Sequence, residues 1–121
     1  SDVCSSDLMA ELPAKVIAQA LKRASLCIDD MSVIEINEAF AAVTLVSTKM
    51  LAGGDEAKWR ELLKKTNPKG GAIAIGHPVG ASGGRILMTM MYELKRRGGG
   101  YGICGICGGL AQGDAVVIRV D

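Results

Sequence analysis

Apolar and polar residues recur along this chain with two different periods, and these periods predict its secondary structure. From Pro13 to Ser25, apolar positions return every three or four residues, which is typical of an amphipathic helix. Residues 32–36 alternate between apolar and polar and predict a strand, whereas 38–51 return to the helical period. Asn37 therefore follows directly after a predicted strand.

The second half of the chain predicts a helix, a strand, a helix and two strands, over 55–65, 72–75, 81–97, 100–107 and 115–120. The expected element order is αβααβαββ. Strands that alternate with helices predict an α/β fold with a mixed, mainly parallel sheet and helices on both faces. The last two strands are joined by a short connection, so we expect them to be antiparallel to each other.

The helix predicted over 81–97 is apolar on every side of its first half, where its side chains include Ile86, Leu87, Met88, Met90 and Met91. Such a helix needs cover on two faces. The sheet covers one face, and we expect a layer from another domain or chain to cover the other. A loosely packed, methionine-rich core helix is the alternative interpretation.

Lysine and arginine (14 together) nearly balance aspartate and glutamate (13 together), so the chain has no basic field for nucleic acid or an anionic membrane surface. No apolar run reaches the roughly 18 to 20 residues of a membrane span, and the first residues lack the pattern of a secretory leader. We therefore expect no nucleic-acid or membrane partner. The expected location is the cytoplasm, with an organelle matrix as the alternative.

The length of 121 residues suits a single domain with its own core. Residues 1–8 are polar, rich in serine and without a period. We expect them to form a disordered or foreign tail that carries no function. The expected domain then covers 9–121.

The four cysteines, Cys4, Cys27, Cys104 and Cys107, are expected to be free thiols, because a chain with this much aliphatic core needs no disulfides. A zinc site requires four ligands, and the chain has no second Cys-x-x-Cys pair, so we expect no metal. A redox pair usually begins a helix, whereas Cys104 and Cys107 fall in a predicted strand. If that strand is extended, their spacing of three aims the two thiols at opposite faces.

His77 is the only histidine, and it lies in a glycine-rich turn after the strand predicted over 72–75. Ligand sites of open α/β sheets collect outside the carboxyl ends of strands, where Asn37, His77 and either Cys104 or Cys107 are expected. An imidazole, a thiol and an amide that meet there would supply a proton-transfer pair and an oxyanion donor. The alternative interpretation is a partly buried histidine that caps a tight turn.

Three motifs, in their order along the chain, resemble the carboxyl-terminal half of the thiolase family. They are NEAFA at 37–41, GGAIAIGHPVGASG at 70–83 and CGG at 107–109. The resemblance runs from about Leu12 to Asp121. It implies the fold of a thiolase carboxyl-terminal domain, and a parent enzyme that condenses two acetyl-CoA molecules or cleaves a 3-ketoacyl-CoA.

The resemblance also implies a role for individual residues. In thiolases the asparagine of the first motif holds a water that forms an oxyanion hole with the histidine of the second, which implies this role for Asn37 and His77. The cysteine of the third motif moves the α-proton, a task that falls to Cys107, with Cys104 as its rival. By the same resemblance, Gly109 lends its amide to a second oxyanion hole, and Phe40 lines the substrate pocket. No cofactor is implied, because coenzyme A thioesters are the substrates.

Thiolases attack with a cysteine from their amino-terminal half, which this sequence does not contain. We therefore expect the chain to be a fragment that is inactive alone. Its expected partners are an acyl-CoA, an amino-terminal thiolase domain and, in the intact enzyme, further copies of itself in a homo-oligomer. Two alternatives remain: a noncatalytic subunit or scaffold that pairs with a separate amino-terminal chain, and a self-contained hydrolase built on Cys107 and His77.

Overall fold

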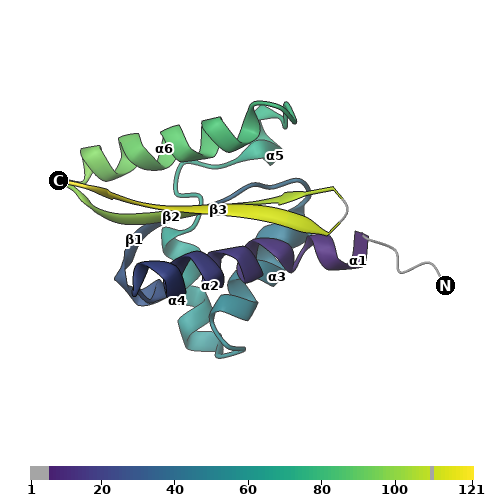
Figure 1. The fold of residues 1–121 in the computed structure, drawn as a ribbon, viewed down its shortest axis with the longest axis horizontal. Coiled ribbons are helices and arrows are strands. Elements are labelled where there is room, and N and C mark those ends of the chain that lie inside the picture. Colours follow the sequence, from purple (N-terminus) through teal and green to yellow (C-terminus); the bar gives the residue numbers. More distant parts are fainter. Residues whose placement is uncertain (1–5, 110) are drawn as a thin grey trace.

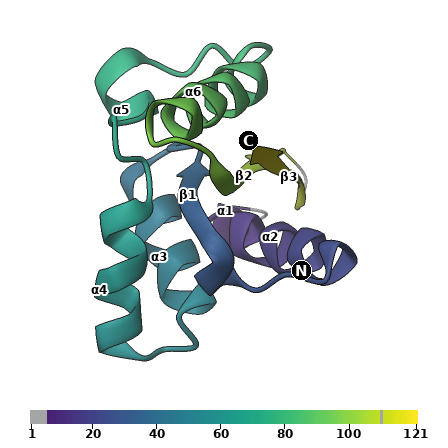
Figure 2. The ribbon, with the colours of Figure 1, turned by 90° about the vertical axis from the view of Figure 1, so that its left-hand side faces the viewer.

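The computed structural model describes residues 6–109 and 111–121, and its centre is a three-stranded sheet between two layers of helix (Figure 1). On one side lies α6 (Ser82–Arg96), and on the other lie α2 (Leu12–Ala24), α3 (Ala41–Leu51) and α4 (Glu56–Lys65). The view along the strands separates the two layers clearly (Figure 2). This arrangement confirms the α/β fold with helices on both faces.

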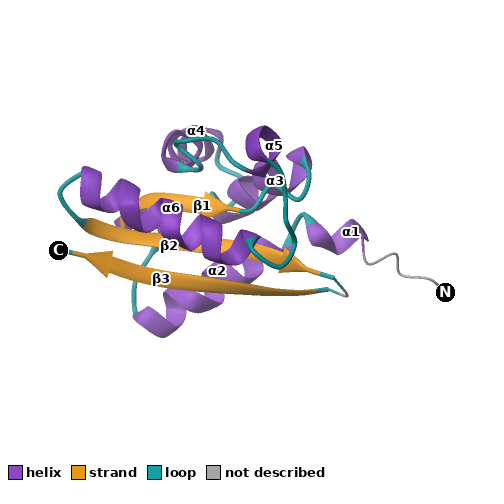
Figure 3. Cartoon of the chain, turned by 90° about the horizontal axis from the view of Figure 1, so that it is seen from above, coloured by secondary structure: helices purple, strands orange, loops and turns teal. Residues whose placement is uncertain are grey.

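The sheet has the order β1 (Met31–Ile36), β2 (Gly100–Gly108) and β3 (Gln112–Val120), with β2 in the middle (Figure 3). β1 and β2 are parallel, whereas β2 and β3 are antiparallel, as their short connection predicts. The sheet is therefore mixed. It divides equally between one parallel and one antiparallel pair, because one strand expected from the sequence does not form.

The prediction of a strand over 72–75 is wrong: these residues form the single helical turn α5 (Ala72–Ile75). A run of four apolar residues has no period that separates helix from strand. The edge of β1 is instead occupied by Asn67, whose backbone N–H donates to Ile34 O at 2.8 Å. The Asn67 side chain pairs with both backbone groups of Ile36, at 2.8 and 2.9 Å. The predicted order αβααβαββ fails at this element.

Three other boundaries differ from the sequence prediction. α3 begins at Ala41 rather than at residue 38, because Phe40 is still extended. β3 begins three residues earlier than expected, at Gln112. A short helix, α1 (Ser6–Met9), overlaps the end of the expected tail, while residues 1–5 lie outside the described part of the chain. α2, α4, α6, β1 and β2 agree with the prediction to within about one residue.

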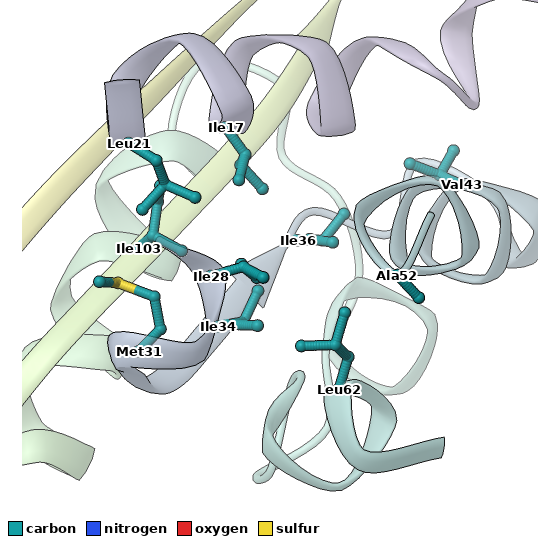
Figure 4. Close-up of a cluster of buried hydrophobic side chains, with 10 residues drawn as sticks. All are labelled: Ile17, Leu21, Ile28, Met31, Ile34, Ile36, Val43, Ala52, Leu62 and Ile103. Atoms are coloured by element: carbon teal, nitrogen blue, oxygen red, sulfur yellow. The ribbon is translucent and has the colours of Figure 1, made fainter. Parts of the chain in front are cut away.

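The hydrophobic core lies on both faces of the sheet. Figure 4 shows the larger cluster, in which Ile17 and Leu21 of α2 face Ile34 and Ile36 of β1 and Ile103 of β2. The second cluster lies beneath α6 and contains Val33, Ile86, Met90, Leu94 and Cys104. The sheet is thus buried on two sides.

The helix predicted to be apolar on all sides, α6, buries only one of its faces. Ile86, Met90 and Leu94 are at most 1% exposed and pack on the sheet. Met88 is 52% exposed, and Tyr92 is also exposed. Within 6–109 and 111–121, no helix is both long and apolar enough to cross a membrane.

Candidate active site

Asn37 stands at the carboxyl end of β1, where the parallel pairing with β2 continues for one more residue. Its backbone N–H donates to Gly105 O at 3.0 Å, and its side chain is completely buried. The ladder therefore fixes the amide at the edge of the sheet where ligand sites of α/β folds collect. The side-chain Nδ2 lies 3.4 Å from Nε2 of His77.

His77 lies in the connection between α5 and α6. Gly76, immediately before it, has a φ of 96° and ends α5 in a conformation that favours glycine. Nδ1 of the imidazole lies 2.6 Å from Oγ of Ser82, in the first turn of α6. Since Nε2 contacts Asn37, both ring nitrogens have a side-chain partner and the ring orientation is fixed.

Glu38 supports this turn, a contribution that the sequence analysis missed. Its Oε2 accepts a hydrogen bond from the backbone N–H of Ile73 at 3.0 Å, which caps α5. Its Oε1 lies 3.4 Å from Nδ2 of Asn67, which pairs with β1. A Cβ on Gly71 would lie only 2.5 Å from Glu38 Oε2. The signal in the sequence is a carboxylate directly after Asn37.

Cys104 and Cys107 point to opposite faces of β2, as their spacing predicts for an extended strand. Cys104 packs beneath α6 and lines a cavity between that helix and β3. Cys107 lines a separate cavity of about 370 Å³, whose walls also include His77, Gly109 and Asp114. Cys107 therefore lies with His77 around one cavity, whereas Cys104 lies around another.

Burial keeps both of these thiols in the neutral form. Desolvation raises the pKa of Cys104 to about 11, with a further contribution from the nearby Glu35 carboxylate. Desolvation also raises the pKa of Cys107. Burial therefore favours the protonated form of Cys107, which is the form that can donate a proton.

The structure brings together four of the five residues singled out in the sequence. Asn37 contacts His77, and His77 shares its cavity with Cys107 and Gly109. Phe40 is 42% exposed and is not among the residues that line this cavity, whereas its neighbour Ala39 is. Asp114 is a cavity residue that the sequence analysis missed, because nothing in its local pattern marks it.

Cys27, Cys104 and Cys107 are free thiols, in agreement with the sequence prediction, and Cys4 lies outside the described residues. Among the residues that the structure describes, no three histidine, cysteine, aspartate or glutamate side chains gather as a metal site would require. The cavity lining carries the imidazole of His77, the thiol of Cys107, the carboxyl group of Asp114, the amide of Gln112 and backbone groups of its glycines.

Comparison with known proteins agrees with this geometry. The model of the family described as "Thiolase, C-terminal domain" matches residues 2–120, which includes most of the expected tail. The chain is 52% identical to a probable acetyl-CoA acetyltransferase of Mycolicibacterium smegmatis over 88% of its length. It is 45% identical to a beta-ketoadipyl-CoA thiolase of Acinetobacter baylyi over 93% of its length. It spans about a quarter of these relatives, 26% of each.

A solved structure gives the same result. All of this chain superimposes on 28% of human mitochondrial 3-ketoacyl-CoA thiolase in complex with CoA, with a TM-score of 0.83 and 41% sequence identity. The fold of residues 6–109 and 111–121 is therefore shared with this thiolase, including the segments that carry Asn37, His77 and Cys107.

Proposed function

This chain belongs to the thiolase family, and on that premise we propose that it supplies the acid/base and oxyanion half of a thiolase active site. The proposed reaction is the Claisen condensation of two acetyl-CoA molecules or the thiolytic cleavage of a 3-ketoacyl-CoA. The observation that carries the proposal is the shared cavity of His77 and Cys107, with Asn37 in contact with the imidazole.

In the synthetic direction, Cys107 removes a proton from the α-carbon of acetyl-CoA, and the electron pair of that C–H bond moves toward the thioester oxygen. Asn37, through a bound water, and His77 stabilise the negative oxygen by hydrogen bonding. The enolate carbon then attacks the carbonyl carbon of an acyl group held as a thioester on a cysteine of the amino-terminal domain, and the backbone N–H of Gly109 stabilises the new oxyanion. Collapse of this tetrahedral intermediate breaks the C–S bond, so that the cysteine leaves as a thiolate and the 3-ketoacyl-CoA is released. Cleavage runs the same steps in reverse, with Cys107 protonating the departing carbanion.

The raised pKa of Cys107 fits its role as the proton donor of the cleavage direction, in which the thiol begins in its neutral form. In synthesis, the thiol must first lose its proton, and a positive charge or a hydrogen-bond donor beside the sulfur would stabilise the thiolate. An amino-terminal thiolase domain, which supplies the nucleophilic cysteine and most contacts to coenzyme A, is the proposed source. The chain alone is therefore proposed to be inactive, and the scheme needs no separate cofactor.

The proposal extends to location and assembly. A cytoplasmic or organelle-matrix enzyme suits a balanced net charge and coenzyme A substrates. We place the intact enzyme among homo-oligomers. A noncatalytic scaffold is not favoured, because the similar proteins carry the names of enzymes and the polar residues of the cavity are all present.

A chimera tests the proposed function. This chain replaces the quarter of the M. smegmatis relative to which it is 52% identical, and the rest of that relative supplies the amino-terminal domain. The folded chimera is expected to convert acetoacetyl-CoA and free CoA into acetyl-CoA, whereas the chain alone is expected to show no turnover. The unmodified relative is the positive control, and a chimera with Cys27→Ser, which changes an exposed cysteine, is the matched control.

A chimera that folds, binds coenzyme A and still shows no cleavage or condensation would contradict the proposed function. Turnover by the isolated chain with a simple thioester and water would instead favour the self-contained hydrolase. Each outcome is measured by the release or consumption of free thiol.

A further inference from the structure

Ser82 connects the histidine of the cavity to the first turn of α6, and neither its hydroxyl nor its position has a role in the scheme above. The side chain is 1% exposed. Its Oγ lies 2.6 Å from Nδ1 of His77 and 3.2 Å from the backbone oxygen of Pro78. A buried hydroxyl with two partners is a constrained hydrogen-bonding group, because it has a single hydrogen to donate.

The partners of this hydroxyl determine the direction of the hydrogen bonds. The oxygen of Pro78 only accepts, so the Ser82 hydroxyl donates to it and has its lone pairs left for Nδ1. His77 then carries its proton on Nδ1. Nε2 is left with a lone pair, which accepts from the side-chain amide of Asn37 at 3.4 Å.

The opposite direction leaves an unfavourable contact. If the Ser82 hydroxyl donated to Nδ1, a neutral His77 would carry its proton on Nε2. That N–H would then face the N–H groups of Nδ2 of Asn37 in a part-buried place, unless the Asn37 amide turned by 180° to present Oδ1. With the Asn37 amide oriented as in this structure, the relay from Asn37 through His77 and Ser82 to Pro78 matches a donor with an acceptor at every contact.

We propose that Ser82 is a positioning residue, which holds the neutral imidazole of His77 in the Nδ1–H tautomer. Nε2, on the side of Asn37, is then the single place where the ring accepts a proton. The consequence for catalysis rests on the proposed function: a thiol that approaches the ring gives its proton to Nε2. The new Nε2–H can then donate to an oxyanion, once this nitrogen no longer accepts from Asn37. This is the arrangement of a base oriented by a third group.

The single histidine of the chain makes a direct test possible. In ¹⁵N-histidine-labelled chain in alkaline buffer, where the imidazole is neutral, long-range ¹H–¹⁵N correlation spectra assign the proton to one ring nitrogen. The wild type is expected to carry it on Nδ1, which is the less favoured tautomer of a free histidine. Ser82→Ala is expected to move the major population to the Nε2–H tautomer, and Ser82→Thr, which retains a hydroxyl, is expected to keep Nδ1–H.

Ser47→Ala is the matched control. Ser47 is also fully buried, and its hydroxyl donates to Ala10 O at 2.7 Å, in a different part of the molecule. It is expected to leave the tautomer of His77 unchanged, although it removes a comparable buried hydrogen bond. A shift caused only by general loosening of the fold would appear in both variants.

The proposal is overturned if the wild type carries the proton on Nε2, or if Ser82→Ala leaves it on Nδ1. If Ser82→Ala does not fold, the wild-type spectrum decides alone, since the expected tautomer is opposite to that of a free side chain. The spectra need no substrate. An inactive chimera would therefore contradict the proposed function and leave the role of Ser82 unchanged. An unexpected tautomer would contradict the role of Ser82 and leave the proposed function unchanged.

Discussion

Replacing Cys107 with serine in the chimera is expected to abolish exchange of the α-protons of acetyl-CoA with solvent, while acylation of the second cysteine stays measurable. A serine hydroxyl is a far weaker proton-transfer group than a thiol near neutral pH, and a positioned acid/base group contributes about 10²- to 10⁴-fold to a rate. Deuterium incorporation into acetyl-CoA measures the exchange, and intact-protein mass spectrometry measures the acylation.

Cys104→Ser is the matched control for this experiment. Cys104 is also buried in β2, but it faces α6 and lines a different cavity. Its replacement is expected to cost stability and leave α-proton exchange in place. Exchange that persists in Cys107→Ser and disappears in Cys104→Ser would reassign the base to Cys104.

Folding stability is expected to fall as the pH rises from about 4.5 to about 7, because of Glu35. This residue on β1 is completely buried, and neither of its carboxylate oxygens has a hydrogen-bond partner. Desolvation raises its pKa from 4.5 to about 7, against the attraction of Arg85 and with the help of repulsion from Glu38 and Glu93. The folded chain therefore holds this proton more tightly than the unfolded chain does.

The sign and the size of the effect follow from proton linkage. Below pH 4.5 the carboxyl is protonated in both states, and its full contribution to stability is present. Between 4.5 and about 7 the unfolded chain releases the proton while the folded chain retains it, so stability decreases. At 1.36 kcal/mol per unit of pKa, the total loss is about 3 kcal/mol.

Urea unfolding at pH 4.5 and at pH 7 measures this loss. Glu35→Gln is expected to flatten the dependence between these two values and to make the chain more stable at neutral pH. Glu61→Gln, which removes an exposed carboxylate on α4, controls for the change in net charge. An equal pH dependence in the wild type and in Glu35→Gln would contradict the assignment.

A second carboxylate acts in a different pH window and has the opposite sign. Hydrogen bonds from Arg96 and Arg97 lower the pKa of Glu93 from 4.5 to about 2. Its contribution to stability is present above pH 4.5 and is lost as the pH falls toward 2. Because the two windows meet only at their boundary, the interval above pH 4.5 separates the effect of Glu35 from that of Glu93.

The sequence predicts much of this fold because the strongest patterns are local. The alternation of apolar and polar residues over 32–36 locates β1. Residues 100–107 do not alternate in this way, but the glycine-rich turns on either side mark the ends of β2. The failure at 72–75 has a physical cause outside the segment. Asn67 occupies the edge of β1, and Glu38 caps the helical turn, so tertiary contacts decide a conformation that four apolar residues leave open.

Part of the candidate site was predictable, because the spacing of residues along a strand determines the face to which their side chains point. Cys104 and Cys107 point to opposite faces because their separation is odd, and Asn37 lies at the ligand-binding edge because it follows a strand. The supporting residues were not predictable in this way. Ser82 reaches His77 only because the chain turns at Gly76 and α6 begins nearby. The pattern of apolar and polar residues does not reveal such a contact.

The central claim is that the imidazole of His77, in contact with the Asn37 amide, and the thiol of Cys107 meet around one cavity although they are distant in sequence. The most direct test compares the ring resonances of His77 and the side-chain amide of Asn37 in the wild type, in Cys107→Ala and in Cys27→Ala. Cys27 precedes β1, at the end of the sheet opposite Asn37, about 20 Å away along a six-residue strand. Cys107→Ala is expected to shift both sets of resonances, and Cys27→Ala to leave them in place. Resonances of His77 and Asn37 that do not respond to Cys107→Ala would contradict the shared cavity and the function built on it.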